Sequence, residues 1–80
     1  MRFRIHTIEK TVFDGDVSGV TLETEAGEIT VLPHHAPLIT LVKSGSVSIY
    51  RGEEESRVIE ISGGFLEVKP ENMGATLLVA

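Results

Sequence analysis

The feature that most constrains this chain is a repeated two-residue alternation of polar and apolar side chains. The alternation appears at residues 2–7, 20–23, 28–31, 46–49, 58–61 and 65–68. Successive side chains of a strand point to opposite faces, so each stretch predicts a strand with one buried and one solvated face. No stretch carries the apolar spacing of an amphipathic helix, and we expect no helix.

Residue usage supports the same fold class. Val, Ile and Thr, which favour pleated strands, make up 23 of the 80 residues. Turns are expected at Asp14-Gly15, Ala26-Gly27, Ser44-Gly45, Arg51-Gly52 and Pro70-Glu71-Asn72. The sequence therefore predicts an all-β domain over residues 1–80, a flattened two-layer β-sandwich or barrel of about eight to ten short strands.

Charge and composition exclude several classes of function. The formal net charge of −5 argues against binding to nucleic acid or to anionic lipid headgroups. No apolar run approaches the roughly 20 residues of a membrane-spanning helix, so we expect no direct membrane insertion. Residues 1–10 alternate instead of forming the apolar core of a signal peptide.

Catalytic and metal-binding motifs are not found. The chain has no cysteine, no Gly-x-Ser-x-Gly elbow and no phosphate-binding loop. The histidines are His6, His34 and His35. Adjacent side chains of an extended segment diverge, so His34 and His35 are poor joint metal ligands. We predict no catalytic, cofactor-binding or metal-binding residue.

Two stretches are apolar on both faces, residues 38–42 and 75–79. A strand that is apolar on both faces is covered on both faces. Closure of the sandwich core is one interpretation, and a partner interface is the other. The candidate interface residues are Leu41, Val42, Leu77 and Leu78.

The segment between residues 33 and 37 carries two prolines four residues apart. Each proline fixes its own φ and biases the preceding residue to extended geometry, which predicts a stiff, exposed loop that presents His34 and His35. A stiff loop loses little entropy on docking, which suits a protein–protein contact. An ordinary rigid connector remains an equal interpretation of the same residues.

The run from Glu25 to Leu38, EAGEITVLPHHAPL, closely resembles the signature of the ε subunit of F-type ATP synthases. Three further runs resemble the family at Phe13–Val20, Gly45–Ile49 and Ile61–Val68. The resemblance covers essentially the whole chain. It implies the family's N-terminal flattened β-sandwich. The C-terminal helical hairpin that most bacterial members carry is not among residues 1–80, so the resemblance does not carry the inhibitory or nucleotide-binding roles of that hairpin.

The resemblance implies a non-catalytic rotor subunit of the central stalk. Such a subunit binds the γ subunit, touches the polar loops of the membrane c-ring, and helps to couple ion translocation to ATP synthesis. It would be peripheral, on the cytoplasmic side of a bacterial plasma membrane. The residues expected to face the c-ring are Glu28, Pro33, His34, His35, Ala36 and Pro37. The residues expected to face γ are Leu41, Val42, Leu77 and Leu78.

Two residues depart from the family pattern. His34 and Thr30 stand where the family commonly has glycine, so a left-handed backbone at His34 would be strained. The alternative functions are a free-standing β-sandwich that binds a small ligand, and a metal-dependent enzyme of cupin type. The first would need clustered aromatic residues, but the aromatic side chains are scattered along the chain.

Overall fold

The computed structural model describes residues 1–70 and 73–80. This part of the chain contains no α-helix and nine strands, which confirms the predicted fold class and strand number. The strands are β1 (Arg2–His6), β2 (Thr11–Asp16), β3 (Gly19–Thr24), β4 (Gly27–Val31), β5 (Leu38–Val42), β6 (Gly45–Arg51), β7 (Glu54–Ile61), β8 (Gly64–Val68) and β9 (Ala75–Val79). The turn predicted at Pro70-Glu71-Asn72 falls partly on residues 71 and 72, outside the described residues.

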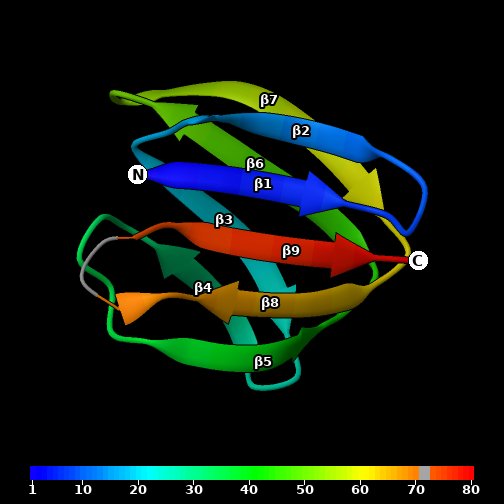
Figure 1. Cartoon of the computed structure of the whole chain (residues 1–80). Coiled ribbons are helices and arrows are strands. Elements are labelled where there is room, and N and C mark those ends of the chain that lie inside the picture. The colour runs from blue at the N-terminus through cyan, green and yellow to red at the C-terminus, as the bar shows by residue number, and fades with distance from the viewer. Residues whose placement is uncertain (71–72) are drawn as a thin grey trace.

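The strands form one curled sheet that folds into two layers (Figure 1). One layer has the order β2-β1-β9-β8-β5, and the other has the order β4-β3-β6-β7. A single pairing of Thr24 with Val42 joins β3 to β5 and links the layers. β1 and β9 are parallel, although they lie at opposite ends of the sequence.

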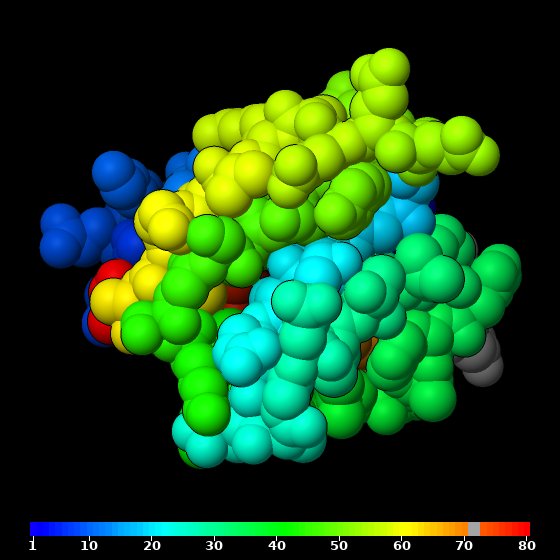
Figure 2. Space-filling model, turned by 180° about the vertical axis from the view of Figure 1, so that it is seen from behind, coloured from blue at the N-terminus to red at the C-terminus, as the bar shows by residue number. Residues whose placement is uncertain are grey.

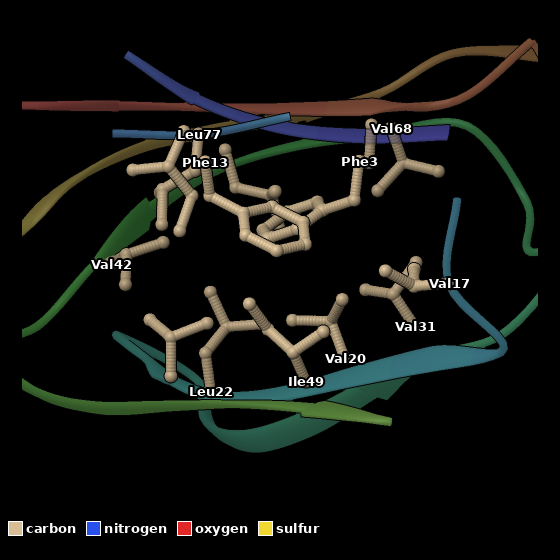
Figure 3. Packing of buried hydrophobic residues seen from close by; sticks show 14 residues of the cluster. Phe3, Phe13, Val17, Val20, Leu22, Val31, Val42, Ile49, Val68 and Leu77 are labelled. Atoms are coloured by element: carbon tan, nitrogen blue, oxygen red, sulfur yellow. The ribbon is translucent and has the colours of Figure 1, made fainter. Parts of the chain in front are cut away.

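The core lies between the two layers, where inward side chains face one another (Figure 3). β1 shows the alternation that builds it: Phe3 and Ile5 are buried, and Arg2 on the outward face is exposed. Leu22 and Ile49 of the second layer are also at most 1% exposed. Burying such a side chain contributes about 1.5–3 kcal/mol, so these inner faces are the main source of favourable free energy for the fold.

One predicted turn is wrong. Asp14-Gly15 lies within β2, where Gly15 pairs with Phe3 of β1. A Cβ at Gly15 would lie 3.2 Å from the Phe13 ring, so this glycine makes room for a core side chain. The actual turn before β2 spans residues 7–10, where the Thr7 amide donates to the Lys10 carbonyl at 2.8 Å. The turns predicted at residues 26–27, 44–45 and 51–52 do connect consecutive strands.

The two ends of the sandwich carry different segments (Figure 1). The N-terminus, the β4–β5 connection and the end of β8 share one end. The C-terminus and the turn at residues 7–10 lie together at the other end. The proline-containing loop therefore projects from the end that also carries the N-terminus.

Candidate functional site

The two strands that are apolar on both faces divide their side chains between the core and the solvent. Val42 and Leu77 point inward and are 5% and 0% exposed. Leu41 and Leu78 point outward and are 55% and 52% exposed. The prediction that all four residues form a partner surface is therefore wrong for Val42 and Leu77, because strand alternation places their side chains in the core.

The sheet register brings the outward residues of three strands together. Phe65 of β8 pairs with Leu41 of β5 on one side and with Leu78 of β9 on the other. Neighbouring strands are about 4.8 Å apart, so these three side chains form one continuous row. Ile39 lies two residues from Leu41 on the same face of β5. We call Ile39, Leu41, Phe65 and Leu78 the apolar face; each is between 43% and 63% exposed.

The sequence does not reveal Ile39 and Phe65 as members of this surface. The alternation over residues 65–68 does put Phe65 on the same face as Glu67, and both are exposed. The signal that would have found it is the pairing of β8 between β5 and β9, which no local pattern reveals. A contiguous exposed apolar surface of this kind is typical of a protein–protein contact.

The outer face of the other layer, formed by β3, β4, β6 and β7, is seen from behind in Figure 2. The Thr21 and Thr30 hydroxyl oxygens lie 3.0 Å apart, and the Ser46 hydroxyl donates to Glu60 at 2.5 Å. Thr21 also pairs with Ser48 in the ladder between β3 and β6. We call Thr21, Thr30, Ser46 and Ser48 the hydroxyl face. The hydroxyls of Thr21, Thr30 and Ser46 are engaged in hydrogen bonds within this face, as is typical of a surface that stays in water.

The predicted proline-stiffened loop is a tight turn followed by an extended segment. The His35 amide donates to the Leu32 carbonyl at 3.0 Å, with Pro33 and His34 between them. His34 has a φ of 67°, as the family's glycine at this place implied. Proline at the second position and a left-handed third residue are the features of a type II turn. Pro33, His34, Ala36 and Pro37 are exposed, as predicted.

His35 differs from the prediction of a fully presented imidazole. It is half-buried, and its Nδ1 lies 2.6 Å from the Ala36 carbonyl oxygen, so that Nδ1–H donates there. Both loop histidines line a shallow hollow with Met1, Val68, Lys69 and Gly74 at the end of the sandwich. The loop is therefore packed on the body of the domain, which supports the predicted stiffness.

The resemblance implies that Glu28 shares a surface with this loop, but the structure places Glu28 near the start of β4. It pairs across the ladder with Glu23 of β3, and the two like charges face each other on an exposed surface. Glu28 is near the start of β4 and the loop follows its end, so about 10 Å of strand separates Glu28 from Val31. The two parts of the predicted c-ring surface are not in contact.

Charged side chains lie on the outer face of β1 and β2, next to the apolar face. Arg2 Nε donates to Asp14 Oδ1 at 2.7 Å, and Arg4 Nε lies 3.4 Å from the same oxygen. The hydrogen bond from Arg2 lowers the pKa of the Asp14 carboxyl below its usual range, and the same bond raises the pKa of Arg2. The N-terminal ammonium lies 3.1 Å from Asp16.

The described residues do not gather three or more His, Asp or Glu side chains in an arrangement that could hold a metal ion. In residues 1–70 and 73–80, no helix has the length and apolar character needed to cross a membrane. The surface features of this domain are thus two contrasting sheet faces and one stiff loop.

Comparison with known proteins gives a consistent result. The family described as "ATP synthase, Delta/Epsilon chain, beta-sandwich domain" matches residues 1–78. The ATP synthase epsilon chain of Herminiimonas arsenicoxydans is 39% identical over 79 residues, which cover 98% of this chain and 55% of that protein. The epsilon chain of Dehalococcoides mccartyi strain CBDB1 is 40% identical over 73 residues, covering 91% of this chain and 51% of that protein. The chain thus spans about half the length of these curated relatives.

Solved structures share the fold. A chain of the Tetrahymena thermophila mitochondrial ATP synthase, from a structure of its central stalk and c-ring, superimposes with a TM-score of 0.80 at 17% identity. The match covers 98% of this chain and 61% of that one. A chain of the Euglena gracilis mitochondrial ATP synthase also gives a TM-score of 0.80, at 20% identity, covering 96% of this chain and 48% of that one.

Proposed function

The chain belongs to the family of ATP synthase delta/epsilon-chain β-sandwich domains, and from this premise we propose that it is a non-catalytic rotor component of the central stalk. In this role, residues 1–80 act as one rigid domain that binds the γ subunit and touches the c-ring. The domain passes torque between the two and catalyses no reaction itself. It is peripheral, and its association with the cytoplasmic side of a bacterial plasma membrane is indirect, through the c-ring.

The observation that carries this proposal is the apolar face. Its four side chains are exposed, contiguous and not required by the core. A solvated surface of this kind favours contact with another apolar surface, because each Å² of apolar area that is removed from water stabilises the contact by about 25 cal/mol. The proposed occupant is the γ subunit, and the γ-facing residues are Leu41 and Leu78 with Ile39 and Phe65.

The loop at residues 33–37 is proposed to face the c-ring. Its turn is held by a backbone hydrogen bond and by two prolines, so little conformational entropy is lost on docking. Glu28 would then reach a basic side chain of a c-ring loop from a separate position on β4. An exposed pair of this kind contributes about 0–1 kcal/mol, so binding to γ supplies most of the affinity.

Replacing Leu78 with Asp tests the γ-binding part of the proposal. A carboxylate in a desolvated apolar contact is costly, and we expect the dissociation constant for γ to rise at least about 100-fold. The measurement is calorimetric titration of the γ subunit of the same synthase with the purified chain. Thermal unfolding of the variant should resemble that of the wild type, because Leu78 is 52% exposed.

Val58→Asp is the matched control. Val58 of β7 is 53% exposed and pairs with Ser48 of the hydroxyl face. We expect this variant to bind γ as the wild type does. Equal binding by wild type and Leu78→Asp would refute the apolar face as the γ contact, and no binding of γ by the wild-type chain would refute the rotor role.

A further inference from the structure

The charged side chain of Glu67 lies on β8, between the strands that carry the apolar face. Glu67 follows Phe65 by two residues on β8, so both side chains point outward from the same layer. In the ladder Glu67 lies opposite Ile39 of β5 and opposite Thr76 of β9. Because β8 lies between β5 and β9, a partner that covers Ile39 and Leu78 also covers Glu67 (Figure 1).

Glu67 is exposed, and nothing in the part of the chain that the structure describes forms a hydrogen bond or an ion pair with its carboxylate. Two cationic residues belong to the same layer. Lys69 follows Glu67 by two residues, directly after the end of β8. Arg4 pairs with Thr76, two strands and about 10 Å away from Glu67. Arg4 lies 3.4 Å from Asp14 instead.

A carboxylate in this position is solvated in the free domain and loses water when a partner covers the apolar face. Taking an ionised carboxylate out of water without a compensating partner is strongly unfavourable. A surface that buries the four apolar residues must therefore offer a cation or several hydrogen-bond donors opposite Glu67. The bidentate fork of an arginine suits a carboxylate best, and a lysine ammonium also serves.

We propose that Glu67 is a specificity-determining residue of the apolar face, which forms a charge-assisted hydrogen bond with an Arg or Lys side chain of the γ subunit. This inference rests on the proposed docking of γ and adds the chemistry that γ must present. The four apolar side chains supply affinity without fixing the orientation of the partner. The pair at Glu67 fixes the register of the two surfaces and disfavours apolar partners without a matching cation.

The test is a titration of wild-type chain, Glu67→Gln, Glu67→Arg and Glu23→Gln with the γ subunit of the same synthase. Glu67→Gln keeps the size of the side chain but leaves the cation of γ without its counter-charge, so we expect the dissociation constant to rise about tenfold or more. Glu67→Arg places like charges together and should weaken binding further. Glu23→Gln, an exposed glutamate of the other layer, should bind as the wild type does.

Two readouts separate this role from a structural one and from failure of the docking proposal. The melting temperature of the free Glu67→Gln domain should equal that of the wild type, because the carboxylate has no partner within the described residues. If Glu67→Gln binds γ within about twofold of the wild type while Leu78→Asp does not bind, the apolar face is the contact and the proposed pair is refuted. If Leu78→Asp binds normally, the docking proposal fails first, and the role of Glu67 fails with it.

Discussion

The two outer faces of the sandwich are built from the same kind of strand and carry opposite chemistry. The apolar face exposes Leu41, Phe65 and Leu78 in one row across β5, β8 and β9. The hydroxyl face presents Thr21 and Thr30 within 3.0 Å of each other across β3 and β4. Both layers turn apolar side chains inward, so the core has no need of a further apolar surface.

This difference separates what folding requires from what function requires. An inner face must be apolar in any sandwich of this size, because burial between the layers is the main source of stability. An outer face is free to be polar, as the hydroxyl face is. An outer face that remains apolar exposes a surface that favours association, and its side chains are explained by a partner.

The largest expected effect on stability is at Leu77 and Leu78, neighbours on β9 whose side chains point to opposite sides of the sheet. Leu77→Ala should lower the free energy of unfolding by about 2–5 kcal/mol, because it leaves a cavity in the core. Leu78→Ala should lower it by less than about 1 kcal/mol, because only cross-strand contacts on an exposed surface are lost. Urea unfolding of both variants measures the difference. Equal losses would mean that the apolar face is part of the folding core.

A smaller effect on stability is expected in the loop at residues 33–37, which is the third surface feature of the domain. His34 has a φ of 67°, a conformation that costs an ordinary residue about 1–2 kcal/mol and glycine almost nothing. His34→Gly should therefore be about 1 kcal/mol more stable than His34→Ala. The comparison of these two variants isolates the backbone, since neither has an imidazole. An alanine variant as stable as the glycine variant would contradict the assigned turn.

The smallest effect concerns the ion pair beside the apolar face. The hydrogen bond from Arg2 lowers the pKa of Asp14, so the folded state favours the ionised carboxylate. The resulting stability is present above the ordinary pKa of about 4 and is lost as the pH falls through the lowered folded value. Asp14→Asn should therefore be slightly less stable than the wild type at pH 7 and equal to it near pH 2, as thermal unfolding would show. A difference that persists at pH 2 would assign the effect to packing instead of charge.

Much of this architecture follows from local sequence patterns. Alternation identified strands because most of them bury one face, and it correctly put Leu66 and Phe65 on opposite faces of β8. The turn predicted at Asp14-Gly15 was wrong because, in sequence, a glycine that makes room for an aromatic ring cannot be told from a glycine in a turn. The loop was predictable because two prolines restrict the backbone whatever surrounds it.

The candidate site was predictable only in part. Residues 38–42 and 75–79 were identified as unusual, but alternation alone does not say which side of a doubly apolar strand meets the core. The missing members, Ile39 and Phe65, depend on β8 lying between β5 and β9, a long-range pairing with no local signature. The position of Glu67 beside the apolar face depends on the same pairing, since its neighbours across the sheet are far away in sequence.

The most direct test of the account compares the two outer faces in the presence of γ. The chain has no cysteine, so Leu41→Cys and Val58→Cys each introduce a single reactive thiol. The measurement is the rate of maleimide labelling of each variant, alone and with a saturating amount of the γ subunit. We predict that γ slows labelling at position 41 many-fold and leaves the rate at position 58 unchanged. Slowed labelling at position 58 with an unchanged rate at position 41 would contradict the account.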